Sequence, residues 1–352
     1  MRKKKALLVI GDRKTNRIKT NRSFVIFVKY ARKLKDSWAF ELKVINYAQL
    51  LSGISPAIEA AEISVVFFFP YKYWNNNIEI YPDARIYGDK KFGREFKIFF
   101  GKVEKAIGRH YGQRRIKYLN SPKAICLDRD KKASKDLLRR RKIPTPPLLK
   151  AYSFDDIQKL INKGVSLYIK PGFGALGKGI TYIDRQGATS NFLFHKSKIV
   201  SRIHKSKWKF AGIEEKERFL NKLLKKGFIC EEAIESAVFK GRRFDFRIYV
   251  IFGNVVYLYA KSSQAGSYVT NWSQGGRIDR KKKILNTLPE RKIDFLKKLA
   301  KRAARALGLN FTGIDIIFSK DLKSAYVLEG NAFPGYEKGF DLMKCLLDYL
   351  VK

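Results

Sequence analysis

A glycine-rich stretch between two lysines is the first part of the sequence that could do chemistry. Residues 168–183 read YIKPGFGALGKGITYI, with Lys170 before the glycines and Lys178 among them. From Gly172 to Lys178 the spacing matches a phosphate-binding P-loop, G-x-x-x-x-G-K, but Gly179 stands where a P-loop has the serine or threonine that binds Mg²⁺. A P-loop also leads into a helix, whereas the alternating, β-branched residues after this loop predict a strand. The P-loop interpretation therefore fails on both chemistry and context.

Two interpretations of the glycine-rich loop remain. It could be a plain flexible hairpin, or it could be a mobile lid whose backbone amides and ammonium groups cover phosphates. One lysine at the end of the preceding strand and another within the loop favour the lid. The residues that would then contact a nucleotide are Lys170, Gly174, Gly177, Lys178 and Gly179.

Two carboxylates and an amide near the end of the chain form a second candidate site. Asp315 lies in the apolar run TGIDIIF, and Glu329 and Asn331 lie two residues apart in YVLEGNAFPG. Residues two apart on a strand project from the same face. An all-oxygen set of this kind suits Mg²⁺, with phosphate oxygens and water in the remaining positions. The alternative is that both carboxylates form salt bridges with the abundant lysine and arginine, since buried carboxylates need partners.

Alternating strands and helices are predicted to position these groups. Apolar, β-rich runs at 6–10 and 63–71 indicate buried strands, and the mixed patterns between them predict a small α/β domain up to about residue 120. Further on, Ser153 and Asp156 have the spacing of a capping box at the start of a helix. Strands are then predicted on both sides of the glycine-rich loop.

The last third of the chain predicts a hairpin, one strong helix and two more strands. The segment FDFRIYVIFGNVVYLYAKSS is typical of a β-hairpin, which we expect to turn at Gly253-Asn254. Residues 289–307 place their apolar side chains on one helical face, and Gly308 is expected to end that helix. The segments TGIDIIFS and SAYVLEGN are predicted strands, and they carry the candidate metal ligands.

The composition describes a basic globular protein. Of 352 residues, 45% are hydrophobic and 14% aromatic, which excludes a disordered chain. The net charge of +42 would attract nucleotides, acidic peptides, nucleic acid or anionic membranes, but a source-wide enrichment in lysine would give the same total. Cys126, Cys230 and Cys345 lie far apart, which favours a reducing compartment. No apolar run reaches the length of a membrane span or a signal-peptide core, so we expect a cytoplasmic protein.

In their order along the chain, these motifs resemble the ATP-grasp superfamily from about Asn120 to Gly335. The segment DRDKKASKDLLRRRKIPTP is similar to the family's first nucleotide-binding segment, with Lys131 as the contacting lysine. FICEEAI resembles the hinge strand that meets adenine, and FDFRIYV resembles the D-x-R strand, which here carries Arg247. YIKPGFGALGKGI, TGIDII and VLEGNAFPG are similar to the glycine lid and the magnesium strands. Each motif alone is weak, but the ordered set is specific.

The resemblance implies an ATP-grasp fold, α/β and α+β in class, after a small N-terminal α/β pre-ATP-grasp domain. The implied division is residues 1–120 for the N-terminal domain, 121–229 for a central subdomain with the lid, and 230–352 for a C-terminal subdomain with the metal site. ATP and Mg²⁺ are the implied cofactors. The nucleotide would be held by Lys131, Lys170, the lid and the hinge residues Glu231, Glu232, Ala233 and Ile234, and the metal by Asp315, Glu329 and Asn331.

The implied reaction is carboxylate–amine ligation through an acyl phosphate, with release of ADP and phosphate. Arg247 and Asn271 would stabilise the tetrahedral oxyanion. Three alternatives remain open. The chain could be a binding or coat-associated protein with little catalysis, or a kinase-like phosphoryl transferase. It could also bind nucleic acid, which the charge favours, although no RRM, KH or zinc-finger signature is present.

Two branches of the superfamily are the most similar, namely the glutamate-adding amino-acid ligases and the spore-coat-associated YheC/YheD-like proteins. The segment SYVTNWSQGGRI resembles both. The glutamate-ligase pattern has arginine where this chain has Val269 and Gln274, so the carboxylate and the amine stay unassigned. From the net charge, Arg247 and Arg277 we predict an acidic substrate, such as an acidic peptide or an anionic cofactor.

Overall fold

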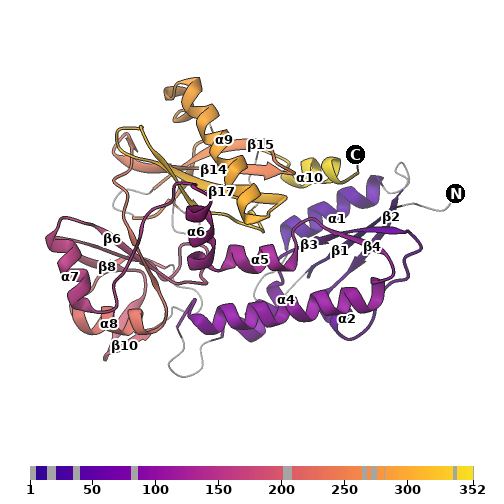
Figure 1. The fold of residues 1–352 in the computed structure, drawn as a ribbon, viewed down its shortest axis with the longest axis horizontal. Coiled ribbons are helices and arrows are strands. Elements are labelled where there is room, and N and C mark those ends of the chain that lie inside the picture. The colour runs from indigo at the N-terminus through magenta and orange to yellow at the C-terminus, as the bar shows by residue number, and fades with distance from the viewer. Residues whose placement is uncertain are drawn as a thin grey trace.

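The computed structural model of the protein shows three large sheets, which follow one another along the chain (Figure 1). The described residues are 5–13, 21–34, 40–80, 86–200, 208–263, 268–270, 276–280, 282–335 and 339–351. Within these ranges, no helix combines the length and the apolar character needed to cross a membrane.

The N-terminal sheet is parallel and has four strands in the order β2-β1-β3-β4. Its strands are β1 (Lys5–Ile10), β2 (Phe40–Ile45), β3 (Glu62–Phe67) and β4 (Arg115–Tyr118). The flanking helices are α1 (Arg22–Leu34), α2 (Tyr47–Leu51), α3 (Tyr71–Tyr73), a π-helical turn (Trp74–Ile78) and α4 (Lys90–Tyr111). The run ALLVI in β1 is buried at every position, as expected for a parallel strand covered on both faces. The strand predicted at 6–10 is present as β1, whereas that predicted at 63–71 is shorter, because β3 ends at Phe67 and α3 begins at Tyr71.

The central sheet has six strands in the order β11-β8-β7-β6-β12-β5. Its strands are β5 (Leu148–Leu149), β6 (Leu167–Lys170), β7 (Thr181–Asp184), β8 (Gly187–Ser190), β11 (Ala211–Gly212) and β12 (Ile229–Glu232), and a separate hairpin consists of β9 (Leu193–His195) and β10 (Lys198–Val200). The helices of this region are α5 (Pro122–Arg129), α6 (Lys131–Arg140), α7 (Phe154–Asn162) and α8 (Lys216–Lys225). The predicted capping box at Ser153 and Asp156 is confirmed at the start of α7.

The C-terminal sheet has the order β16-β15-β14-β17-β18, with β13 paired to β14. Its strands are β13 (Val238–Phe239), β14 (Arg242–Ile251), β15 (Asn254–Ser262), β16 (Arg277–Ile278), β17 (Phe311–Phe318) and β18 (Ala325–Glu329). It is accompanied by a 3₁₀ turn (Leu285–Thr287), α9 (Glu290–Leu307) and α10 (Leu342–Val351). The left-handed Gly308, at φ 68°, ends α9 as predicted.

The β14–β15 hairpin turns one residue earlier than predicted. Ile251 pairs with Asn254, so the two-residue loop is Phe252-Gly253 instead of Gly253-Asn254. Both loop residues have positive φ, 45° and 77°. This geometry matches the right-handed twist of the strands, and it is tolerated here at a phenylalanine.

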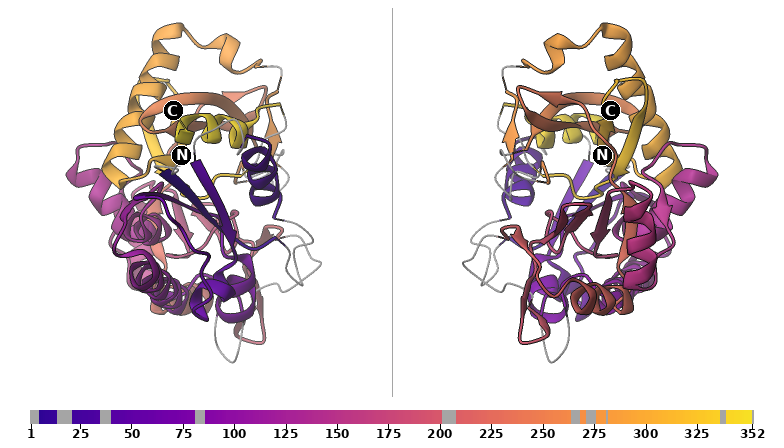
Figure 2. Two further views of the ribbon diagram at one scale, coloured as in Figure 1. Left: turned by 90° about the vertical axis from the view of Figure 1, so that its right-hand side faces the viewer. Right: turned by 90° about the vertical axis from the view of Figure 1, so that its left-hand side faces the viewer.

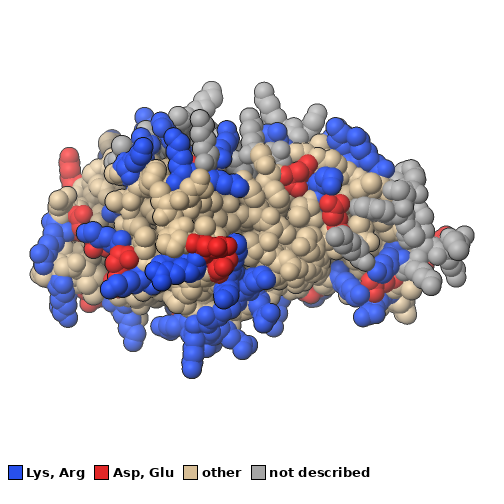
Figure 3. Space-filling view, turned by 90° about the horizontal axis from the view of Figure 1, so that it is seen from above, with Lys and Arg blue, Asp and Glu red and all other residues tan. Residues whose placement is uncertain are grey.

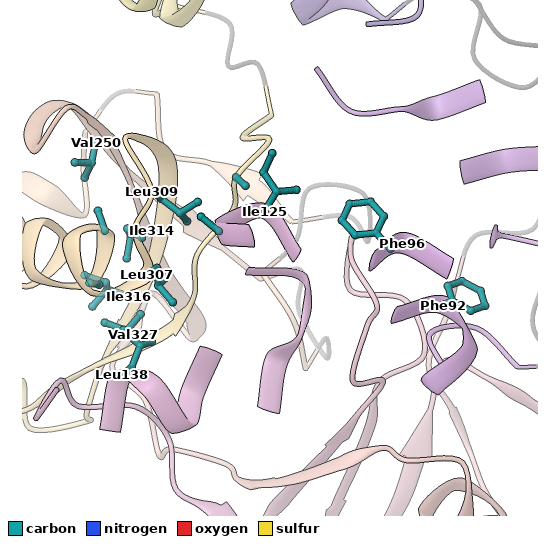
Figure 4. Close-up of a cluster of buried hydrophobic side chains, with 14 of the residues drawn as sticks. Phe92, Phe96, Ile125, Leu138, Val250, Leu307, Leu309, Ile314, Ile316 and Val327 are labelled. Atoms are coloured by element: carbon teal, nitrogen blue, oxygen red, sulfur yellow. The ribbon is translucent and has the colours of Figure 1, made fainter. Parts of the chain in front are cut away.

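A continuous apolar core joins the three parts. Figure 4 shows α9, β17 and β18 packed against α5 and α6 through Leu307, Ile314, Val327, Ile125 and Leu138, and the same cluster continues to Phe92 and Phe96 of α4. At the other end, α10 lies beside α1 of the N-terminal domain (Figures 1 and 2). The start of α6 is thereby fixed next to the ends of β17 and β18.

Candidate active site

The central and C-terminal sheets face each other across a pocket. Of the residues predicted from the sequence, its lining includes Lys131, Lys170, Gly174, Gly177, Lys178, Glu231, Glu232, Ile234, Asp315 and Glu329. Gly179, Ala233 and Asn331 follow lining residues closely in the chain, and Arg247 is hydrogen-bonded to one of them. Asn271 lies outside the described residues. The fold thus brings groups as far apart as Lys131 and Glu329, separated by 198 positions, into direct contact.

A row of charged residues crosses the C-terminal sheet on the pocket side. Asp315 on β17 is the register partner of Arg247 on β14 and of Glu329 on β18, so the three side chains share one face. Arg247 holds the carboxylate with two hydrogen bonds, Nε to Oδ1 at 2.5 Å and Nη2 to Oδ2 at 2.6 Å. Lys261 donates to Oδ1 from 3.1 Å. Asp315, at 3% exposure, is therefore a buried carboxylate bound by two cations.

Glu329 forms the other end of this row. Lys131 Nζ donates to Glu329 Oε2 over 2.8 Å, from the first turn of α6. Burial opposes ionisation of Glu329, but Lys131, with Arg247 and Lys261 farther away, lowers its pKa to about 2. Burial likewise opposes the charge of Arg247, yet the adjacent Asp315 raises the pKa of Arg247 well above its usual value. The two carboxylates among the three predicted metal ligands thus form ion pairs, which is the alternative that the sequence left open.

Asp315 and Glu329 still have the arrangement that a divalent cation needs. They are neighbours on one face, both line the pocket, and their oxygens are the hard donors that Mg²⁺ prefers. In the described part of the chain, no three His, Cys, Asp or Glu side chains converge well enough to hold a metal by themselves. The two carboxylates therefore fit Mg²⁺ only together with further oxygens, such as those of a nucleotide.

The expectation that Glu329 and Asn331 share a strand face is wrong, because β18 ends at Glu329. The amide nitrogen of Asn331 donates to the carbonyl of Gly313 at 3.1 Å. Its backbone N–H donates to Thr312 Oγ1, also at 3.1 Å. Asn331 is thus fixed beside the row by contacts to β17, and its role as a metal ligand remains a prediction.

Lys135, which was not among the residues predicted from the sequence, completes a second ionic cluster on the central side. Lys135 Nζ lies 3.0 Å from Glu231 Oε2, and Lys170 at the end of β6 donates to the other oxygen of Glu231. Lys135 and Glu231 are only 4% and 1% exposed. Burial lowers the pKa of Lys135, whereas Glu231 beside it works in the opposite direction. The signal was present, because Lys135 follows Lys131 by four residues on one helix and so lies on the same face.

The glycine-rich loop connects two strands, as predicted, and its glycines are required by its shape. Gly177 and Gly179 have φ values of 65° and 73°. A Cβ on Gly179 would lie 2.6 Å from the ring of Phe192, so a side chain there would also clash. The carbonyl of Gly172 accepts a hydrogen bond from the backbone N–H of Lys131 at 3.0 Å, which ties the loop to the start of α6.

The loop is docked on the N-terminal domain, which no local sequence pattern indicated. The hydroxyl of Tyr87 accepts from the N–H of Ala175 at 2.9 Å and lies 3.2 Å from its carbonyl oxygen. Lys178 donates to Glu79 over 2.6 Å and lies 5.0 Å from the centre of the Tyr87 ring. The second lysine of the predicted lid is thus already paired with a carboxylate.

Residues 231–234 connect the two sheets at one end of the pocket. The backbone N–H groups of Glu232 and Ala233 donate to Pro147 and Ser166, so both are used within the central part. The side chains of Glu232 and Ile234 line the pocket, opposite Ile317 and Leu328 of the C-terminal sheet. These lining residues combine apolar and polar side chains, and the assignment of residues 231–234 as a hinge for adenine remains a prediction.

Comparison with known proteins identifies the family to which this architecture belongs. A family model for YheC/D-like ATP-grasp proteins matches residues 137–344, which is more than half of the chain. The chain belongs to the YheC/D-like ATP-grasp family. The resemblance inferred from the motifs is therefore confirmed.

Curated relatives of this ATP-grasp chain are named as ligases. It is 29% identical over 221 residues to a protein of Alkalilimnicola ehrlichii named "Probable alpha-L-glutamate ligase", covering 62% of this chain and 60% of that one. It is 28% identical over 254 residues to a Pseudomonas paraeruginosa protein of the same name, covering 70% and 71%. The chain thus spans about three fifths of the first relative's length.

Solved structures confirm the ATP-grasp fold. The macrocyclase MdnC of Microcystis aeruginosa, bound with precursor peptide MdnA, has a TM-score of 0.56 at 12% identity, covering 98% of this chain and 99% of that one. The ATP-grasp ligase PsnB, in complex with a minimal precursor, Mg and ADP, has a TM-score of 0.54 at 16% identity, covering 98% and 97%. At such identities the likeness concerns the fold alone.

Proposed function

We propose that this ATP-grasp protein is an ATP- and Mg²⁺-dependent carboxylate–amine ligase of the acid–amino-acid type. The observation that carries the proposal is the pocket itself, where lysines and a glycine lid on one wall face the Asp315–Glu329 pair on the other. This arrangement suits a nucleotide triphosphate held with a divalent cation. The names of the curated relatives support ligation as the outcome of ATP use.

The walls of the pocket indicate where the parts of ATP would bind. Adenine would lie at residues 231–234, against Ile317 and Leu328. The phosphates would lie toward Lys131 and Lys170, covered by the lid. Mg²⁺, held by Asp315 and Glu329, would supply charge neutralisation on the phosphate oxygens.

In the proposed reaction, an oxygen of the substrate carboxylate attacks the γ-phosphorus of ATP and displaces ADP. A neutral amine then attacks the acyl carbon of the acyl phosphate, loses a proton and expels inorganic phosphate. Arg247 uses two of its five N–H donors on Asp315, so it orients that carboxylate and keeps others for an oxyanion. Closure of the lid would exclude water from the acyl phosphate, which would otherwise hydrolyse.

The deciding experiment is ADP release with a panel of carboxylates and amines, followed by mass spectrometry of the product. A ligase requires both an acid and an amine, and its product is heavier than the acid by the amine minus water. ADP release with an acid or alcohol alone, giving a stable phosphorylated product, would establish a kinase-like transferase instead.

A binding protein with little catalysis is the second candidate, and the ion pairs favour it. Asp315 is already neutralised by Arg247 and Lys261, and Glu329 by Lys131. If nucleotide binds but no acid–amine pair releases ADP, this second function replaces the first.

A further inference from the structure

One cation of the pocket differs from the others in its partners. All five lysines found in the lining of the pocket form ion pairs, namely Lys131, Lys135, Lys170, Lys178 and Lys261. Arg243, on β14, also lines the pocket, but within the described ranges it has no carboxylate at salt-bridge distance. A partly buried guanidinium without a counter-charge is incompletely compensated, so this position is suited to an anion.

Neutral groups hold Arg243 in place. Its Nη1 donates to the hydroxyl of Tyr168 on β6 at 3.1 Å, and its guanidinium carbon lies 5.7 Å from the centre of the Tyr182 ring. Tyr168 in turn donates to the carbonyl of Tyr268 at 2.7 Å, and the rings of Tyr182 and Tyr268 stack at 4.4 Å. The guanidinium is therefore oriented before any ligand arrives, while donors remain for one.

Arg243 lies apart from the row of charged residues formed by Arg247, Asp315 and Glu329. Arg243, Asp245 and Arg247 are alternate residues of β14 and so project from the same face. Arg243 and Arg247 are four residues apart, roughly 13 Å along a strand. Since Arg247 is held on Asp315 and Arg243 on Tyr168, one carboxylate would not bridge both.

We propose that Arg243 binds a second carboxylate of the acid substrate, one that ATP does not activate. This inference rests on the proposed ligase function and names its substrate class, an acid that carries at least two carboxylates, such as a dicarboxylic amino acid or an acidic peptide end. The tyrosines around Arg243 shape the place where this carboxylate binds. Four of the acids that line the pocket are already paired with cations, namely Glu231, Asp245, Asp315 and Glu329, and the fifth is Glu232.

L-glutamate is the probe for this site, with L-glutamine and L-isoglutamine as analogues that each lack one carboxylate charge. Binding is measured by calorimetry on the full chain with Mg²⁺ and a non-hydrolysable ATP analogue. L-glutamate should bind the wild type more tightly than at least one of the two amides, and Arg243→Gln should weaken that binding roughly tenfold to a hundredfold. Arg243→Lys, which keeps the charge but not the planar fork, should recover part of the loss.

Two control variants separate anion binding from a purely structural role. Arg242 precedes Arg243 on the same strand and points to the opposite face, so Arg242→Gln removes the same charge without touching the pocket. It should leave L-glutamate binding unchanged within about twofold. Tyr168→Phe removes the hydroxyl that orients Arg243 and should weaken binding less than Arg243→Gln does. The affinity for the ATP analogue should stay within about twofold in all of these variants.

Three results would overturn the proposal. The first is a wild type that binds L-glutamate no better than either amide, or not at all. The second is an Arg243→Gln variant that binds L-glutamate as the wild type does. The third is a parallel loss of nucleotide affinity, which would place Arg243 at ATP instead. Because calorimetry needs no turnover, a positive result stands even if ADP release fails, and failed ADP release overturns only the ligase function.

Discussion

The central and the C-terminal walls of the pocket differ in their ratio of cationic to anionic side chains. On the central wall, Lys135 and Lys170 share the single carboxylate of Glu231, so positive charge is in excess. On the C-terminal wall, Asp245 and Asp315 pair with two cations of their own sheet, Arg247 and Lys261, and Glu329 adds a third carboxylate. The comparison explains why an anionic phosphate and a divalent cation can be expected on opposite sides of one cleft.

The carboxylates of the C-terminal wall pair partly with a cation from another part of the fold. Asp245 and Asp315 share Lys261, and Asp315 also binds Arg247. Glu329 takes its partner, Lys131, from α6. Binding of a metal and a nucleotide would therefore rearrange partners across the cleft, with Lys131 free to turn from Glu329 to phosphate once a cation replaces it.

The largest expected effect comes from removing the carboxylates of the C-terminal wall. Glu329→Gln should lower Mg²⁺-dependent turnover by about a hundredfold or more, since charge neutralisation by a bound metal contributes several kcal/mol. Asp315→Asn should cause a similar loss. It should also lower the free energy of unfolding by about 3–5 kcal/mol, because Arg247 and Lys261 lose a buried partner.

The matched control for these variants is Glu235→Gln. Glu235 forms an exposed ion pair with Lys320, at 2.7 Å, and such pairs contribute little. Its turnover and melting temperature should stay near those of the wild type. Normal Mg²⁺-dependent ADP release in both Glu329→Gln and Asp315→Asn would show that neither carboxylate holds the metal.

The central wall offers the next largest effect, this time on stability. Glu231→Gln leaves two lysines, one of them fully buried, without a counter-charge, which should cost about 3–5 kcal/mol in the free energy of unfolding. Lys170→Met keeps the Lys135–Glu231 pair, so it should weaken ATP binding with a smaller loss of stability. Thermal melts and nucleotide calorimetry on both variants measure the difference, with the exposed Glu235→Gln as control. Equal loss of stability in the two variants would contradict the conclusion that the central wall has more positive than negative charge.

Asp128 and Glu329 should respond to pH in opposite directions. Burial raises the pKa of Asp128 to about 6, whereas Lys131 lowers that of Glu329 to about 2 against the effect of burial. A lowered folded-state pKa gives stability that is present above the unfolded value, about 4.3, and is lost as pH falls toward 2. A raised folded-state pKa, as for Asp128, gives stability at low pH that is lost as the pH rises from about 3.9 through 6.

The variant Asp128→Asn therefore should stabilise the protein at pH 7, by on the order of 2 kcal/mol, and change little at pH 3. Asn keeps an oxygen for the N–H of Ala332, which Asp128 now binds at 2.9 Å. Glu329→Gln should lose part of the stability that the wild type gains between pH 2 and 5. Chemical denaturation at pH 3, 5 and 7 tests both. Destabilisation of Asp128→Asn at pH 7 would show that the ionised form is favoured after all.

Most of this arrangement could be predicted where chemistry follows from local spacing. The glycine-rich loop between two strands, the capping box at Ser153 and the carboxylates on β17 and β18 follow from periodicity and short motifs. The prediction that Asn331 shares a strand face with Glu329 was wrong because the strand pattern was extended past Glu329, where β18 ends. Lys135 was missed although its four-residue spacing from Lys131 placed both on one helical face.

Contacts between distant segments could not be predicted in this way. The bond from Lys178 to Glu79 spans 99 positions, and Tyr87 reaches Ala175 across 88. They depend on how the N-terminal domain packs against the lid, which periodicity does not encode. The partners of Asp315 could not be predicted either, because a buried carboxylate can bind a metal ion or pair with lysine and arginine side chains.

The smallest expected effect concerns charge outside the two walls. Arg277 on β16 is exposed, and its register partner is Ser262, so it can act on a substrate only through its field. Figure 3 shows Lys and Arg spread over one face in several separate groups, as a source-wide enrichment would also produce. If the field of the cleft matters, Arg277→Glu should raise the KM for an acidic substrate about twofold to threefold, and Lys298→Glu, at an exposed position of α9, should not. The difference should shrink at high salt, because the screening length is already about 8 Å near physiological ionic strength. Equal small effects from both swaps would mean that charge beyond the pocket is background, and that recognition of an acid depends on the paired walls and Arg243 alone.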